Sequence, residues 1–79
     1  MAAALALLGT RGCHLCDVAE GLLTRAATAR HIDWQYRDIA LDEDLVARYG
    51  ERIPVLLADD GRELAWPFSL LDIIRFSEG

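Results

Sequence analysis

Two cysteines separated by two residues are the side chains of this sequence best suited to chemistry. A disulfide between Cys13 and Cys16 would close a loop too small to brace a fold, so the spacing indicates a reactive pair. On a helix, residues three apart lie on the same side, one turn from each other, which lets the two sulfurs meet. All eight basic residues are Arg and none is Lys, which excludes Schiff-base and phosphate-loop lysine mechanisms. Thiol chemistry is therefore the first hypothesis.

The two cysteines differ in their expected place on the helix that begins at the motif. Cys13, at the helix start, would lie against unpaired backbone N–H groups and the positive end of the helix dipole, which favour a thiolate. Cys13 is therefore the expected nucleophile, and Cys16, one turn deeper, suits the resolving role of attacking a mixed disulfide. A protonated His14 would raise the thiolate fraction of Cys13, whereas a neutral, exposed loop histidine would not.

Two other interpretations of the cysteine pair stay open at this point. Free cysteines are often small buried hydrophobes with no chemical role. A zinc site needs four ligands, and two cysteines with His14 or His31 form an incomplete set without a partner chain. We expect neither a bound metal nor a bound cofactor.

The Ile53-Pro54 bond precedes the third expected strand. Cis peptides occur at X-Pro bonds in tight turns, and a cis bond would expose the backbone of Ile53 to an incoming peptide or thiol ligand. An ordinary proline at a strand start is the alternative. Arg52 precedes this bond and Arg11 precedes the cysteine motif, so both could flank one groove and bind an acidic ligand, or remain solvated surface charges.

Periodicity predicts the elements that hold these residues. The aliphatic run over 2–9 is typical of a strand buried on both faces. The spacing of apolar residues after Cys13 is typical of a helix, and the alternation of apolar and polar residues after His31 is typical of an edge strand. We expect strands over 2–9, 31–39, 55–58 and 63–66, and helices over 13–30, over 42–49 and from Pro67 onward.

Local signals support several of these boundaries. Asp42 is a helix N-cap residue, Gly50 is placed to end that helix, and Asp59-Asp60-Gly61 between two strand-like runs indicates a hairpin. Pro67 suits the first turn of the last helix. That helix should bury the following side chains: Phe68, Leu71 and Ile74, with Leu70 and Ile73 beside them.

The order β-α-β-α-β-β-α predicts an α/β fold with a four-stranded mixed sheet flanked by three helices. A chain of 79 residues allows a single domain over 1–79. The net charge of −5 has the wrong sign for nucleic acid, and no apolar stretch approaches the ~20 residues of a membrane span. A close dithiol without other cysteines indicates a cytoplasmic protein.

The segment LLGTRGCHLCDVAEGLL, followed by RIPVLLADDGREL, resembles the glutaredoxin and thioredoxin superfamily, and most closely the small bacterial glutaredoxin-like proteins of uncharacterised function. The resemblance spans nearly the whole chain and implies the thioredoxin fold. It makes Cys13 the nucleophile and Cys16 the resolving cysteine. It also implies that Pro54 is the facing cis-proline, that the backbone of Ile53 pairs with glutathione or substrate, and that Arg11 steers glutathione carboxylates.

Two stretches depart from the glutaredoxin pattern. His14-Leu15 stand between the cysteines where glutaredoxins usually have Pro-Tyr, so the redox potential of that family cannot be assigned to this pair. The residues 65–69, Ala-Trp-Pro-Phe-Ser, replace the Gly-Gly pair and the Asp or Ser that hold the γ-glutamyl end of glutathione. Glutathione binding should therefore differ from that of ordinary glutaredoxins.

These observations lead to one main functional expectation and two alternatives. We expect a monomeric thiol-disulfide oxidoreductase that reduces protein or glutathione mixed disulfides, with glutathione as a possible co-substrate and an external reductant system. A Cu(I) chaperone also carries C-x-x-C after its first strand, but its order is β-α-β-β-α-β. A redox-inert binding domain would use residues 66–68 as a contact surface.

Overall fold

The computed structural model of the chain describes residues 4–78 and contains four strands and three helices. Their order is the expected β-α-β-α-β-β-α. The elements are β1 (Leu5–Gly9), α1 (His14–Arg30), β2 (Trp34–Asp38), α2 (Glu43–Tyr49), β3 (Val55–Ala58), β4 (Glu63–Ala65) and α3 (Leu70–Ser77). Residues 2 and 3 of the first expected strand lie outside the described part of the chain.

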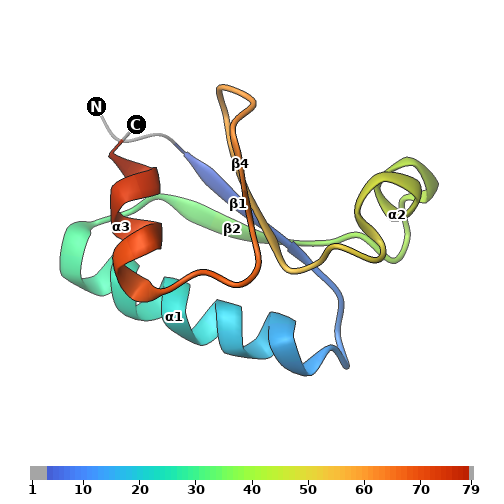
Figure 1. The fold of residues 1–79 in the computed structure, drawn as a ribbon, viewed down its shortest axis with the longest axis horizontal. Coiled ribbons are helices and arrows are strands. Elements are labelled where there is room, and N and C mark those ends of the chain that lie inside the picture. Colours follow the sequence, from blue (N-terminus) through green and yellow to red (C-terminus); the bar gives the residue numbers. More distant parts are fainter. Residues whose placement is uncertain (1–3, 79) are drawn as a thin grey trace.

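The four strands form one mixed sheet in the order β2-β1-β3-β4 (Figure 1). β1 pairs with β2 in parallel and with β3 in antiparallel orientation, and β3 pairs with β4 as a hairpin. The predicted edge position of β2 and the predicted hairpin are therefore confirmed. Leu8 lies opposite Val55, so the carboxyl end of β1 and the start of β3 meet at the same end of the sheet.

Helices α1 and α3 lie on the same side of the sheet and cover its principal buried face (Figure 1). Side chains alternate along a strand, and Leu5 and Leu7 of β1 therefore point together into this core. Leu23 of α1 and Ile73 of α3 meet them there and are fully buried. This layer fixes α1, and with it the cysteine motif, against the end of β1.

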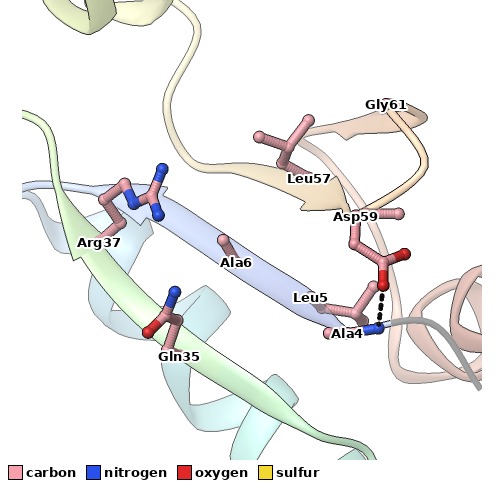
Figure 2. Close-up of a pocket in the computed structure, with 9 residues that line it drawn as sticks. Ala4, Leu5, Ala6, Gln35, Arg37, Leu57, Asp59 and Gly61 are labelled. Carbon is pink, nitrogen blue, oxygen red and sulfur yellow. Dashed lines mark hydrogen bonds between the residues drawn. The ribbon is translucent and has the colours of Figure 1, made fainter.

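The other face of the sheet is covered only in part. A second apolar cluster joins Leu8 and Val55 of the sheet to Ile39 and Tyr49, and α2 supplies the last of these. Away from α2 the same face carries a shallow hollow, which Figure 2 shows on the side of the sheet remote from α1. Its lining includes Ala4, Leu5, Ala6, Gln35, Arg37, Leu57, Ala58, Asp59 and Gly61.

The last helix begins later than the sequence predicts. Ser69 is the N-cap of α3 and forms a capping box with Asp72, so the helix starts at Leu70 and not at Pro67. This reciprocal pair satisfies two backbone N–H groups, a stronger start signal than the fixed φ of a proline. Pro67 instead follows a cis bond from Trp66.

The buried stripe of α3 is narrower than predicted. Ile73 is fully buried in α3, whereas Leu71, expected inside, is 53% exposed. In α1, Leu15 and Val18 are exposed, because each lies one position before a residue of the stripe that faces the sheet. Successive helical residues differ by about 100° in direction, so a neighbour of the stripe already turns toward solvent. The stripe of α1 consists of Cys16, Ala19, Leu23 and Ala26.

The described residues, 4–78, include no helix with both the length and the apolar character needed to cross a membrane.

Candidate functional site

The loop between β1 and α1 places Cys13 at the N-cap of the helix. The backbone N–H of Cys13 donates to the carbonyl of Thr10 at 3.3 Å, and Gly12 takes a positive φ of 86° that favours glycine. The Sγ of Cys13 accepts a hydrogen bond from the backbone N–H of Cys16 at 3.2 Å. The sulfur is half-buried and lies at the first unpaired N–H groups of the helix.

Cys16 lies one turn further along α1 and is fully buried. Its side chain faces the sheet together with Ala19. Burial, followed by the neighbouring Cys13 side chain, raises the pKa of Cys16 to about 11. The two cysteines are both free thiols in this structure. The pair therefore combines a half-buried thiol at the helix start with an inner thiol that holds its proton at neutral pH.

Gly9, the last residue of β1, leaves the space into which Cys16 packs. A Cβ added at Gly9 would stand 3.1 Å from both Cβ and Sγ of Cys16 and 2.8 Å from the hydroxyl oxygen of Tyr36. No local sequence pattern by itself indicates a role for Tyr36 or Gly9 in this site. A glycine directly before the motif is a signal for close approach, but the strand register is needed to bring Tyr36 to it.

The predicted cis bond between Ile53 and Pro54 is confirmed. Pro54 is fully buried and directly precedes Val55, the residue paired with Leu8 near the end of β1. It therefore lies at the end of the sheet from which the Cys13 loop departs. The backbone N–H of Ile53 donates to the carbonyl of Tyr49 at 3.0 Å, so this N–H group is already paired within the chain.

Arg11 and Arg52, the two predicted ligand-binding arginines, each have an acidic partner. Arg11 pairs with Glu20 of α1 at 3.4 Å. Arg52 pairs with Glu63 of β4 at 3.1 Å, and the hydrogen bond from Tyr49, followed by Arg52, lowers the pKa of Glu63. Exposed ion pairs of this kind contribute about 0 to 1 kcal/mol, so an acidic ligand can compete for either arginine.

The remaining candidates sit at the surface or in the core. His14 is exposed at the first position of α1. Phe68 is buried, and its ring meets that of Trp66 edge to face at 5.0 Å. The predicted burial of Phe68 is therefore confirmed, which weakens the alternative of a contact surface over 66–68. In residues 4–78, no three His, Cys, Asp or Glu side chains gather as a group that could hold a metal ion.

A family model described as "Glutaredoxin-like domain (DUF836)" matches residues 4–76 of the chain. No curated protein matches the chain significantly. The X-ray structure of the structural-genomics target protein XcR50 from X. campestris is 36% identical, covers 94% of this chain and 95% of its own, and superposes with a TM-score of 0.82. Protein Ne2328 from Nitrosomonas europaea is 25% identical over 98% of this chain and 93% of its own, with a TM-score of 0.80.

A more distant match is thioredoxin 1 from Thermosipho africanus TCF52B, which is 18% identical. It covers 95% of this chain and 90% of its own, with a TM-score of 0.69. At this identity the likeness concerns the fold alone. It confirms the thioredoxin-like arrangement expected from the sequence.

Proposed function

Because the chain belongs to the glutaredoxin-like domain family, we propose that it is a thiol-disulfide oxidoreductase acting through Cys13 and Cys16. The observation that carries this proposal is the placement of the two sulfurs. Cys13 Sγ caps the N-terminus of α1, and the backbone N–H that it accepts belongs to Cys16, the second cysteine. Disulfide exchange proceeds by attack of a thiolate on a disulfide sulfur, which a thiol at a helix start can perform with a second thiol one turn away.

In the first step the Cys13 thiolate attacks one sulfur of a substrate disulfide. The Cys13 sulfur forms a mixed disulfide with that half of the substrate, and the substrate S–S bond breaks. The other half leaves as a thiolate, which takes a proton from solvent. The hydrogen bond from the Cys16 backbone N–H at 3.2 Å and the helix N-terminus stabilise the attacking charge.

In the second step Cys16 loses its proton and its sulfur attacks Sγ of Cys13. The mixed disulfide breaks, an intramolecular disulfide between Cys13 and Cys16 forms, and the second half of the substrate leaves as a thiolate. Two electrons have then passed from the protein to the substrate. An external thiol reductant returns them and restores the dithiol. The resolving step requires deprotonation of a buried thiol whose pKa is raised to about 11, and it should therefore be slower than the first.

Substrate recognition is proposed for the surface around Cys13 and Pro54. The carbonyl of Ile53 would accept a backbone hydrogen bond from a bound peptide or from glutathione, and Arg11 and Arg52 would attract its carboxylates. His14 stands beside the nucleophile on the exposed side. We propose protein disulfides or glutathione mixed disulfides as substrates, glutathione as co-substrate, and a monomer working in the reducing cytoplasm.

The test compares the parent with Cys13→Ser and Cys16→Ser in the reduction of a glutathione mixed disulfide. Turnover is coupled in turn to glutathione with its reductase and to thioredoxin reductase. We expect turnover by the parent in one system, none by Cys13→Ser, and a midpoint potential within roughly −270 to −180 mV. A Cys13→Ser variant that reduces disulfides at the parental rate would rule out the proposed nucleophile. No turnover together with tight Cu(I) binding would favour metal handling instead.

A further inference from the structure

The hydroxyl of Tyr36 is buried, and within the described residues it has no hydrogen-bond partner. The ring lies on β2, half-buried against the principal core. Leu7 of β1 is its partner in the parallel register, so both side chains point to the face covered by α1. Most buried polar groups in proteins are paired, and one that is not calls for an explanation.

The unpaired hydroxyl is held beside the resolving cysteine. The position of a Cβ on Gly9 would be 2.8 Å from the hydroxyl oxygen of Tyr36 and 3.1 Å from Sγ of Cys16. The oxygen and the sulfur can therefore be no farther apart than the sum of these two distances. Electrostatic interaction with Cys16 also contributes to the raised pKa of Tyr36. The absence of a side chain at Gly9 leaves both groups in one small buried space.

Arg11 lies over the aromatic ring of Tyr36. Its guanidinium carbon is 4.2 Å from the centre of that ring, and the guanidinium also forms an exposed ion pair with Glu20 of α1 at 3.4 Å. Burial is the main cause of the raised pKa of Tyr36, which keeps the phenol protonated, while the positive charge of Arg11 acts in the opposite direction. The phenol is thus a protonated donor whose O–H is polarised by a cation.

We propose that Tyr36 is a positioning residue for the resolving step, in which its hydroxyl donates a hydrogen bond to the Cys16 thiolate. This inference rests on the proposed oxidoreductase function. In the reduced protein Cys16 is a neutral thiol and needs no strong donor. Once Cys13 carries a mixed disulfide, Cys16 releases its proton to solvent, and the Tyr36 O–H compensates for part of the burial of the new charge. The Cys16 sulfur then attacks Cys13, and Tyr36 keeps its own proton throughout.

Other charged and titratable groups also act on this site. Cys13 and Asp17, on the same helix as Cys16, both disfavour a Cys16 thiolate. Asp38, which follows Tyr36 on β2, and Glu20 both disfavour ionisation of the phenol. Within the described residues, the main influence that favours the Cys16 thiolate is the backbone hydrogen bond involving Thr10. A hydrogen-bond donor from β2 would therefore add to the few groups that stabilise the Cys16 thiolate.

The test uses dithiobis(nitrobenzoate), an aromatic disulfide that releases a coloured thiolate, with the reduced protein in a stopped-flow instrument. Attack by Cys13 releases the first thiolate, and attack by Cys16 on the mixed disulfide releases the second. Tyr36→Phe keeps the ring under Arg11 and removes only the hydroxyl. We expect the first phase to be unchanged and the second to be slower by at least about threefold. Loss of one hydrogen bond to a charged group should lower the thiolate fraction of Cys16 about tenfold. The remaining thiolate is more basic and therefore more nucleophilic, which restores part of the lost rate.

Tyr49→Phe is the matched control, because it removes the other tyrosine hydroxyl of the chain, which donates to Glu63. Both phases should then proceed at parental rates. A Tyr36→Phe variant with an unchanged second phase would overturn the role of Tyr36 and leave the oxidoreductase function standing. Slowing of both phases together with a lower urea midpoint would also overturn it, since that pattern marks a packing defect. A parent that releases only one thiolate would refute the proposed function, and this inference with it.

Discussion

The buried thiol of Cys16 should make the stability of the reduced protein fall at alkaline pH. Its pKa in the folded protein is raised from the ordinary value of 9.0 to about 11. Below pH 9 both the folded and the unfolded chain carry the proton, and the thiol adds nothing to the pH dependence. Between about pH 9 and 11 the unfolded chain loses this proton first, which favours unfolding. The full loss should amount to about 3 kcal/mol, since one pKa unit corresponds to about 1.4 kcal/mol.

A loss of this size is large for so short a chain. A native domain is stable by roughly 0.05 to 0.15 kcal/mol per residue, which gives about 4 to 12 kcal/mol for this protein. Few other groups titrate in the alkaline range, because the chain has no Lys. Besides the cysteines and the amino terminus, two tyrosines titrate there, and the raised pKa values of Tyr36 and Tyr49 act in the same direction as that of Cys16.

The assay is urea unfolding of the reduced protein at a series of pH values between about 8 and 11, compared with Cys16→Ala. The variant loses some stability at every pH through lost packing, so only the pH dependence is informative. We expect the parent to lose about 2 kcal/mol more than the variant across this range, because the full loss is reached only above pH 11. The oxidised protein, which has no thiol to ionise, should follow the variant. Equal slopes for parent and variant would refute the reasoning, because Cys16 would then not be desolvated in the folded state.

Two further substitutions test the packing that holds the site. Gly9→Ala places a methyl group 3.1 Å from Sγ of Cys16 and 2.8 Å from the Tyr36 oxygen. We expect a lower urea midpoint together with a changed rate of the resolving step. A variant with parental values for both would show that this space is not tightly filled. Ser69→Ala removes the N-cap of α3, whose hydroxyl accepts a hydrogen bond from the backbone N–H of Asp72 at 3.1 Å. The free energy of unfolding in urea should fall by about 1 kcal/mol. An unchanged value would indicate that the capping box does not set the start of the helix.

The main architecture and the position of Cys13 follow from local sequence signals. The aliphatic run before the motif, the alternation after His31 and the Asp-Gly turn each specify one element through burial or turn chemistry, and all three elements form. The position of Cys13 at a helix N-cap follows from the change of period at the motif. The cis bond at Pro54 is instead expected from the resemblance to the glutaredoxin family, since the local sequence alone also allows an ordinary proline at a strand start.

The approach of Tyr36 to Cys16 could not be predicted in the same way. Tyr36 approaches Cys16 only because β2 pairs in parallel with β1 in the observed register and because Gly9 carries no side chain. Both conditions join residues far apart in the sequence, so no local pattern reveals them. The late start of α3 has a different cause, since two start signals, Pro67 and the Ser69 capping box, compete within three residues and the stronger one prevails.

The energetics of the Tyr36 hydroxyl distinguish a functional role from a packing role. A buried hydroxyl without a partner costs about 1 to 3 kcal/mol, a large fraction of the roughly 4 to 12 kcal/mol available to a domain of this length. If Tyr36 served packing alone, phenylalanine would fill the same space without that cost. Tyr36→Phe should therefore be more stable than the parent, by about 1 kcal/mol in urea unfolding, while resolving its mixed disulfide more slowly. A variant that lost both stability and rate would instead show that the hydroxyl contributes to packing, and the cost assigned to it would be wrong.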